Sequence, residues 1–340
     1  MEPILKIENL KTSFMTGNGE VQAVRGVSFT VGKGEILGLV GESGSGKSVT
    51  AMSVLRLLAD TARIKEGTIT FEGQDLIQMP KKELRKIRGE RISMIFQDPM
   101  SSLNPLIPVG RQVEEMIKEH DPGRKKEEVK EDVLELFRKV RIPEPEKRYK
   151  CFPHEFSGGM RQRVMIAMAL ANKPGLLIAD EPTTALDVTI QDQILKQLRE
   201  LEKEYGTSII FITHDLGVVA ELCDRVAVMY GGLIMEEAMI DDIFERPGHP
   251  YTMGLLASVP DMDQDKAIRL QSIPGSPPDM TNPPKGCPFA PRCPYARQLC
   301  ATELPDFVQV GEGHRSRCFL QYPDAPADEN NPFRKRPYQL

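Results

Sequence analysis

Eight residues near the N-terminus, GESGSGKS at positions 41–48, have the types and spacing of a phosphate-binding loop. Glycines let the backbone turn tightly, so that its N–H groups can point at phosphate oxygens. The pattern G-x-x-x-x-G-K-S lets Lys47 reach the outer phosphates of a nucleotide and lets the Ser48 hydroxyl bind Mg²⁺. The stretch follows the apolar run EILGLV and precedes a helical pattern at 48–58, which is the context that such a loop requires.

A second stretch that could do chemistry is LLIADEP at positions 176–182, an apolar run that ends in Asp180 and Glu181. Ligands of open α/β sheets bind at the carboxyl ends of the strands, where these acids would lie. Asp180 suits the shell of a bound Mg²⁺, and Glu181 suits a general base that accepts a proton from water. A single acid often merely ends a strand, but this pair in a chain with a phosphate loop indicates a hydrolytic nucleotide site.

FSGGM at positions 156–160, followed by RQRVMIAMAL, resembles the signature motif of ABC transporter ATPases. It departs from the commoner LSGGQ, since Phe156 replaces leucine and Met160 replaces glutamine. Three further elements of that family stand in their usual order: Gln97 in IFQDP, Asp187 at the end of TALD, and His214 in FITHD. The resemblance covers roughly residues 4–240.

The resemblance implies two ATP molecules held between two protomers, with each signature motif on the γ-phosphate of the partner's ATP. It also implies that Glu181, His214 and Gln97 are catalytic, and that Ser48, Gln97 and Asp180 hold Mg²⁺. Phe14 either stacks on adenine or is a core residue. The residues expected to contact ATP are Phe14, Gly41, Ser43, Gly44, Gly46, Lys47, Ser48, Val49, Ser157, Gly158, Gly159, Asp180 and Asp187.

The helices and strands expected around these residues indicate an α/β fold. Continuous apolar runs at 176–180 and 208–213 suit strands buried on both faces of a parallel sheet. RVAVMYGGLIMEE at 225–237 suits a hairpin, and apolar residues recur at helical spacing between Lys118 and Lys150. We expect an ABC-type ATPase core built on a phosphate-binding loop, with an inserted helical subdomain and a small irregular C-terminal metal-binding module.

The amino-acid composition of the chain changes near residue 240. Residues 1–240 are expected to form the nucleotide-binding domain, with the helical subdomain at about 100–165. Sixteen of the 27 prolines lie from Pro247 onward, and QSIPGSPPDMTNPPKGCP is too rich in proline for regular helix or sheet. Residues 241–340 are therefore predicted to be a separate and partly irregular module.

The composition of the chain limits where the protein is expected in the cell and which partners it is expected to bind. The net charge of -5 gives no global reason to expect nucleic acid. The N-terminus MEPILKIENLK is not a secretory signal, and no apolar run is long enough for a membrane helix. These features predict the cytoplasm, and the resemblance to ABC transporter ATPases implies a peripheral position at the cytoplasmic face of the cell membrane.

The family resemblance then implies separate permease subunits in the membrane, which dock around Gln97 and the helical insert. It implies a second, homologous ATPase in a heterodimer, or a second copy of this chain. Together with the resemblance of the tail described next, it implies an extracytoplasmic peptide-binding protein as an indirect partner.

The tail gives the finer resemblance. PGHPYTMGLLASVP at 247–260 and IPGSPP at 273–278 are similar to the ATPases of dipeptide and oligopeptide importers, and ERISMIFQDPMSSLNP at 90–105 fits the same branch. The nickel importer ATPases are close relatives and remain an alternative. A soluble ABC ATPase that does not transport is a third hypothesis, although such proteins usually carry a long coiled-coil insertion or two cassettes. A degenerate ATPase is disfavoured by the intact Lys47, Asp180 and Glu181.

Four of the six cysteines lie in the last fifth of the chain, with the spacing C-x5-C-x6-C-x17-C: Cys287, Cys293, Cys300 and Cys318. Disulfides are disfavoured in a reducing compartment, and zinc sites prefer shorter spacings, which leaves a [4Fe–4S] cluster ahead of zinc and of unliganded thiols. The spacing is also similar to that of dipeptide-type ATPases that carry a cluster. His314 is a weaker ligand candidate, and Cys151 and Cys223 are predicted to be plain buried thiols.

Overall fold

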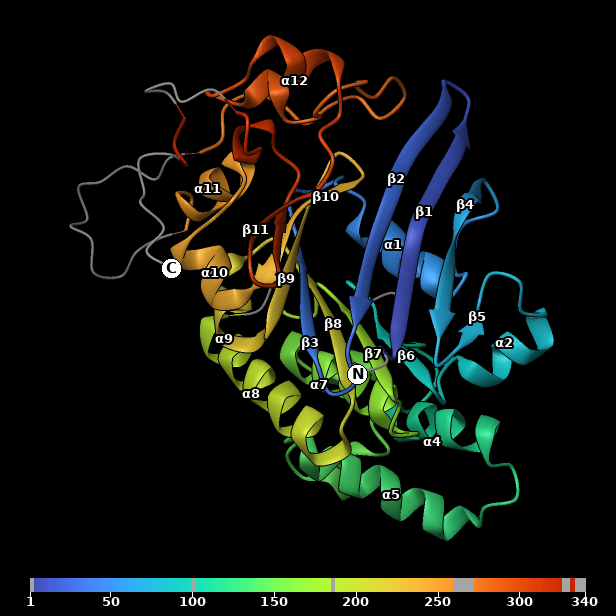
Figure 1. Ribbon diagram of the computed structural model, residues 1–340. Coiled ribbons are helices and arrows are strands. Elements are labelled where there is room, and N and C mark those ends of the chain that lie inside the picture. Colours follow the sequence, from blue (N-terminus) through green and yellow to red (C-terminus); the bar gives the residue numbers. More distant parts are fainter. Residues whose placement is uncertain (1–2, 99–101, 185–186, 260–271, 326–330, 334–340) are drawn as a thin grey trace. The chain divides into compact units, whose positions relative to one another are not determined.

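The computed structural model describes residues 3–98, 102–184, 187–259, 272–325 and 331–333 (Figure 1). The chain forms two compact units, each assembled from segments that are far apart in sequence. Unit 1 consists of Met1–Leu5, Val31–Ile36 and Thr70–Ile212. Unit 2 consists of Lys6–Thr30, Leu37–Ile69 and Thr213–Leu340.

A parallel three-stranded arrangement forms the centre of unit 1. Strand β7 lies between β6 and β8, and Ile178 pairs with Met94 on one side and with Ile210 on the other. All residues of β7 and β8 are buried, as the continuous apolar runs predicted. The strands of this unit are β5 (Gln74–Asp75), β6 (Ile92–Ile95), β7 (Leu176–Asp180) and β8 (Ser208–Thr213).

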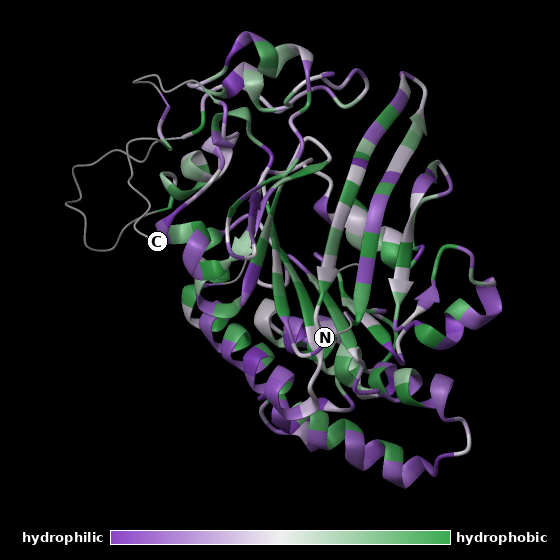
Figure 2. Ribbon diagram, in the orientation of Figure 1, coloured by the Kyte–Doolittle hydropathy of each residue, from purple (hydrophilic) through white to green (hydrophobic). Residues whose placement is uncertain are grey.

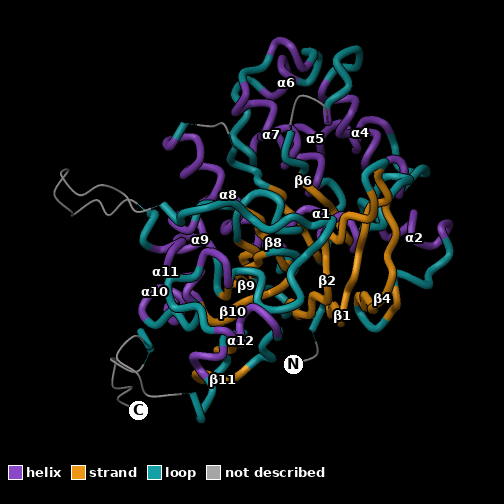
Figure 3. The backbone as a smooth tube through the Cα atoms, turned by 90° about the horizontal axis from the view of Figure 1, so that it is seen from above, coloured by secondary structure: helices purple, strands orange, loops and turns teal. Residues whose placement is uncertain are grey.

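A group of helices forms the rest of unit 1. Helices α4, α5 and α7 pack against one another, and Figure 3 shows them gathered with α6. The apolar positions from Val129 to Phe137 are buried on one side of α5, which confirms the predicted helical spacing; Figure 2 shows the hydrophilic residues between them. The helices are α2 (Lys81–Ile87), α4 (Val109–His120), α5 (Lys126–Lys139), α6 (Pro145–Arg148), η1 (Pro153–Glu155), α7 (Gly158–Leu170) and α8 (Val188–Tyr205).

Two sets of strands form the framework of unit 2. In one set the order is β2, β1, β4, and Figure 3 shows these long strands side by side. In the other, β3 is parallel to β9, and β9 and β10 form the predicted hairpin through Gly231 and Gly232, both at positive φ. The bounds are β1 (Leu5–Thr16), β2 (Gly19–Val31), β3 (Ile36–Val40), β4 (Ala62–Phe71), β9 (Arg225–Tyr230) and β10 (Leu233–Met239).

The C-terminal tail is more regular than its composition predicted. Residues 272–288 have neither helix nor strand, as the proline density indicated. Beyond them, however, β12 (His314–Ser316) pairs antiparallel with β10, and β11 (Val308–Gly311) pairs with β12. These strands are only three and four residues long and partly polar, so they carry no clear alternation of apolar and polar residues in the sequence.

The helices of unit 2 are short. The predicted helix after the phosphate-binding loop ends earlier than expected, because Arg56 adopts a left-handed conformation with φ 50°. None of the helices among the described residues is both long and apolar enough to cross a membrane. The bounds are α1 (Lys47–Val54), α9 (Leu216–Leu222), α10 (Ile240–Glu245), α11 (Pro250–Leu256), η2 (Ala290–Arg292), α12 (Gln298–Thr302) and η3 (Phe319–Gln321).

Candidate functional site

The glycine-rich loop of unit 2 connects β3 to α1, as its sequence predicted. Gly41 has φ 150° and Gly46 has φ 103°, values that favour glycine. A Cβ atom at Gly41 would lie 2.1 Å from the Met229 carbonyl oxygen, and one at Gly46 would lie 2.4 Å from the Ala23 carbonyl oxygen. The loop therefore requires glycine at both positions, for its backbone angles and for the close approach of neighbouring backbone.

The side chain of Lys47 is 95% buried beneath this loop. Its Nζ donates to the carbonyl oxygens of Gly41 at 2.7 Å and Glu42 at 3.0 Å. These bonds hold the ammonium group against the backbone that is expected to enclose the phosphates. Ser43 and Gly44 are exposed at the turn, and Ser48 and Val49 are half-buried at the start of α1.

Two other predicted residues of the ATP site also lie in unit 2. Phe14, in β1, is half-buried, which leaves both its adenine-stacking role and its core role open. His214 follows β8 directly and is exposed, which is where a residue that contacts a ligand at the strand end would lie. Their roles on a nucleotide remain predictions.

The acid pair lies at the carboxyl end of β7 in unit 1. Asp180 is buried as the last residue of the strand. Glu181 follows with φ 47°, a strained left-handed conformation for a residue with a side chain, and its N–H donates to the Ile212 carbonyl oxygen at 2.9 Å. Strained backbone of this kind clusters at functional sites, because the surrounding structure must maintain it.

The carboxylate of Glu181 is held by two donors. Gln97 Nε2 donates to Glu181 Oε2 at 2.9 Å, and Thr184 Oγ1 donates to the same oxygen at 3.0 Å. Gln97 and Glu181 were both predicted as catalytic residues, and the fold brings them together across 84 positions of sequence. Thr184 was not predicted, although its position three residues after Glu181 is a signal that could have identified it.

The signature motif begins a helix, as expected. Ser157 is the N-cap of α7, and its hydroxyl accepts a hydrogen bond from the Met160 N–H at 3.3 Å. Ser157 and Gly158 are exposed, whereas Phe156 is 97% buried and anchors the turn. A Cβ atom at Gly159 would lie 3.0 Å from Ile190 Cγ2, so α8 packs closely here. The exposed N–H groups at this helix start can bind an anion.

Asp187 is the N-cap of α8, and its Oδ1 accepts from the Ile190 N–H at 3.0 Å. The residues before it in the TALD motif, Ala185 and Leu186, lie outside the described residues. The predicted ATP-site residues are thus distributed over both units: the glycine-rich loop, Phe14 and His214 belong to unit 2, and the others belong to unit 1. That they form one site remains a prediction.

The six cysteines form no disulfide. Cys287 and Cys318 are buried, and Cys293 and Cys300 are half-buried. Cys223 is buried as predicted, but the prediction for Cys151 was wrong, because this side chain is only half-buried, like those of Cys293 and Cys300, and its thiol donates to the Lys147 carbonyl oxygen at 3.5 Å in α6.

The four tail cysteines influence one another. Burial raises the pKa of Cys287 to about 11 and that of Cys293 to about 12, and it also raises the pKa of Cys318. In each case the neighbouring tail thiols raise the pKa further, so the four sulfurs lie within electrostatic range. Each of the four sulfurs accepts a hydrogen bond from a backbone N–H group, and contacts of this kind stabilise a thiolate ligand. The donors, in the order Cys287, Cys293, Cys300 and Cys318, are the N–H groups of Phe289, Tyr295, Arg297 and Leu320.

The predicted metal-binding module is nevertheless not supported by the arrangement of side chains. Within the described part of the chain, no group of three or more His, Cys, Asp or Glu side chains is arranged to hold a metal ion. His314 Nε2 lies 2.7 Å from Glu236 Oε1 in a buried pair, so this ring nitrogen is already engaged. The [4Fe–4S] cluster and its zinc alternative therefore remain predictions.

Comparison with known families matches two regions of the chain. Residues 24–184 match the ABC transporter family, and residues 235–300 match the family described as the oligopeptide/dipeptide transporter C-terminal region. The oligopeptide transport ATP-binding protein of Bacillus subtilis (strain 168) is 54% identical over 327 residues, which span 96% of this chain and 91% of the relative. The dipeptide transport ATP-binding protein of the same organism is 52% identical, spanning 94% and 96% respectively.

Solved structures show the same fold. A dimeric ATP-binding cassette in a post-hydrolysis state with ADP and Pi has a TM-score of 0.64 and 29% identity, covering 69% of this chain and 98% of that chain. A component of a Clostridium perfringens ABC transporter complex has a TM-score of 0.62 and 29% identity, covering 73% and 93%. The mixed sheet and its helices are thus those of an ATP-binding cassette.

Proposed function

The chain belongs to the ABC transporter family of ATP-binding proteins, and from this premise we propose that it hydrolyses ATP to power the import of dipeptides or oligopeptides through a membrane. The observation that carries this proposal is identity of 54% that extends over 96% of the chain, since it includes the C-terminal region as well as the cassette. A transport-independent ABC ATPase would not need that C-terminal region. Nickel import remains an alternative cargo, because the permease and the binding protein select the substrate.

Each predicted site residue has a role in this proposal. Lys47 and the N–H groups of residues 41–48 bind the phosphates, and Ser48, Gln97 and Asp180 hold Mg²⁺. Glu181 accepts a proton from the attacking water, and His214 stabilises the charge that develops on the γ-phosphate. The bond from Gln97 to Glu181 supports this assignment, because it fixes the direction in which the carboxylate points.

Two protomers are proposed to close on two ATP molecules. The exposed Ser157 and Gly158 at the start of α7 supply N–H groups and a hydroxyl for the partner's γ-phosphate, and Asp187 lies at the same interface. The partner is a homologous ATPase or a second copy of this chain. The domain division at residues 240 and 241, with the helical subdomain at about 100–165, is part of the same proposal.

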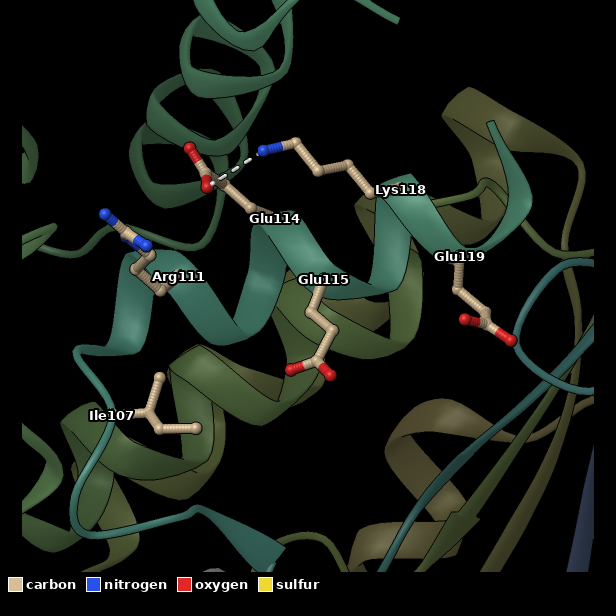
Figure 4. A pocket seen from close by; sticks show the side chains of 6 residues that line it. All are labelled: Ile107, Arg111, Glu114, Glu115, Lys118 and Glu119. Carbon is tan, nitrogen blue, oxygen red and sulfur yellow. Dashed lines mark hydrogen bonds and ion pairs between the residues drawn. The ribbon is translucent and has the colours of Figure 1, made fainter. Parts of the chain in front are cut away.

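The permease subunits are proposed to dock on the helical part of unit 1, which places the chain peripherally at the cytoplasmic face. Helix α4 carries a hollow of about 410 Å³, and Figure 4 shows the charged side chains that line it. Glu114 is buried there and bonds to Tyr149 and Lys118, whereas Glu115 and Glu119 are exposed. Leu106, next to the hollow in sequence, is 83% exposed. The exposed Arg111 also lines the hollow, so its exposed side chains suit a partner segment that is apolar and carries basic groups for Glu115 and Glu119 and an acidic group for Arg111.

Purification from membranes tests this function. A tagged full-length chain is expected to recover integral membrane permeases, and peptide with its binding protein is expected to stimulate ATP hydrolysis by the assembly. Reversing the charges of Glu115 and Glu119 to lysine is expected to reduce the recovered permease about tenfold. The matched control is lysine at Glu127 and Glu128, an exposed pair on α5. Recovery of nucleic-acid-processing proteins without permeases would refute the transport function.

We also propose that Cys287, Cys293, Cys300 and Cys318 hold a [4Fe–4S] cluster, with zinc as the alternative. Support comes from their mutual electrostatic influence and from the backbone N–H group that each sulfur accepts. Burial raises the pKa values of Cys287, Cys293 and Cys318, which disfavours their thiolates in the absence of a cation, so a bound metal would supply the charge that stabilises these thiolates. The cluster would organise a segment that has little regular secondary structure.

Metal analysis of the anaerobically purified chain tests this assignment. We expect brown protein with about four irons per chain, and we expect Cys293→Ser to lose most of that iron. Cys151→Ser is the control, because this thiol lies outside the group and is partly exposed. A colourless protein with one zinc per chain would contradict the iron–sulfur cluster and support a zinc site. A protein without metal would exclude both kinds of site.

A further inference from the structure

Arg292 is an arginine of the cysteine-bearing loop, residues 286–300, whose five N–H donors are all used. Its side chain is 5% exposed, and it lies in η2 between Cys287 and Cys293. Nε donates to the Pro274 carbonyl oxygen at 2.8 Å, and Nη2 donates to that of Ile273 at 3.1 Å. A buried guanidinium in which every donor is satisfied has a fixed position.

The acceptor that this arginine orients is in the phosphate-binding loop. Arg292 Nη1 donates to Glu42 Oε2 at 2.5 Å and Nη2 donates to Oε1 at 3.0 Å, a bidentate pair that spans 250 positions of sequence. Glu42 is the second residue of GESGSGKS. Its own N–H donates to the Tyr251 hydroxyl at 2.8 Å, so both the backbone and the side chain of Glu42 are anchored outside the loop.

Further contacts join the two loops. Phe289, two residues after Cys287, packs on Tyr230 and Tyr251 with ring centroids 5.4 Å and 5.3 Å apart, and Arg292 Nη1 also donates to the Tyr230 hydroxyl at 3.0 Å. A small crevice is lined by residues 42–45 of the phosphate-binding loop and by three residues of the preceding proline-rich segment, Pro277, Pro278 and Met280. The cysteine-bearing loop is therefore packed against the segment that is expected to enclose the phosphates.

We propose that the cysteine-bearing loop holds the phosphate-binding loop in its binding conformation through Arg292, which makes Arg292 a positioning residue for ATP. Two physical effects follow from the pair with Glu42. The glycine-rich backbone is restrained before ATP arrives, which lowers the entropy lost on binding. The negative charge of Glu42 is also balanced by the guanidinium, which reduces its repulsion of the phosphates. The inference depends on the proposed function, because it assigns a regulator of the same nucleotide site.

The test measures the affinity of the full-length chain for MgATP and the steady-state kinetics of hydrolysis. Arg292→Gln is expected to raise the Kd and the KM for MgATP about tenfold, with a much smaller change in kcat. Arg292→Lys keeps the positive charge but loses the two parallel hydrogen bonds to Glu42, so its Kd for MgATP should lie between those of the wild type and Arg292→Gln. If Arg292→Gln folds poorly, the Kd of Arg292→Lys is compared with the wild type instead. Adding Glu42→Gln to Arg292→Gln removes the unbalanced carboxylate and is expected to restore part of the affinity.

The matched control is Arg315→Gln. Arg315 is another arginine of the C-terminal tail; its Nε and Nη2 both donate to Glu237 Oε2, and Nη2 also donates to the Ser28 carbonyl oxygen, away from residues 41–48. The Arg315→Gln chain is expected to have a lower Tm than the wild type and the same Kd for MgATP. If Arg292 had only a structural role, Arg292→Gln would likewise lower Tm without changing the Kd. An Arg292→Gln chain that binds MgATP like the wild type would overturn the inference. A wild-type chain that does not bind MgATP would instead refute the proposed function.

Discussion

Glu181→Gln is expected to lower the kcat of ATP hydrolysis by about 10²- to 10⁴-fold while the chain still binds MgATP, because the substitution removes the proposed general base and little else. Glutamine has the same shape, so its side-chain oxygen can still accept from Thr184 and Gln97, which contact Glu181 at 3.0 Å and 2.9 Å. The left-handed backbone at φ 47° is equally strained for both residues. Since ATP remains bound and unhydrolysed, the variant should also accumulate the closed dimer.

Three measurements check this result: phosphate release, MgATP affinity, and dimer formation by size-exclusion chromatography in the presence of MgATP. The matched control is Glu72→Gln. Glu72 also lies in unit 1 with a left-handed backbone, at φ 46°, and pairs with Arg91 instead of reaching the strand end of β7. The Glu72→Gln variant should hydrolyse ATP at the wild-type rate. Hydrolysis by Glu181→Gln within a few-fold of the wild type would show that another group accepts the proton.

Gly41→Ala is expected to reduce MgATP affinity by more than about 100-fold, because the added Cβ would lie 2.1 Å from the Met229 carbonyl oxygen. Neither of these atoms can move alone, since the Cβ is bonded directly to the backbone of the loop and the carbonyl oxygen belongs to the backbone of β9. Ordinary contact requires a separation of about 3.4 Å, so the loop must shift by about 1 Å, and misplacements of that size can cost 10²-fold. The N–H groups would then no longer converge on the phosphates.

Equilibrium binding of MgATP and urea unfolding together check this prediction. Gly19→Ala is the control in the same unit, since Gly19, the first residue of β2, has φ 119° and a Cβ atom there would have no neighbour within 4 Å. This variant should lose about 1 kcal/mol of stability from backbone strain and keep its MgATP affinity. Equal losses of affinity in the two variants would show that backbone angle, and not the close approach of Met229, makes glycine necessary at position 41.

Features that depend on local residue types could be predicted from the amino-acid sequence. The glycine-rich loop, the apolar strands β7 and β8 and the start of α7 at Ser157 were all predictable, because tight turns, buried strands and helix caps each require particular residues at short spacing. The pairing of β9 with β10 followed from the turn at Gly231 and Gly232 for the same reason.

Tertiary structure alone decided which distant groups meet. No local pattern links Gln97 to Glu181 across 84 positions, Arg292 to Glu42 across 250, or β12 to β10, because such contacts depend on how the whole chain packs. The exposure of Cys151 was mispredicted for the same reason, since burial is a property of neighbours in space. The sequence therefore identified the residue types of an ATPase site, and the fold determined which distant side chains contact Glu181 and Glu42.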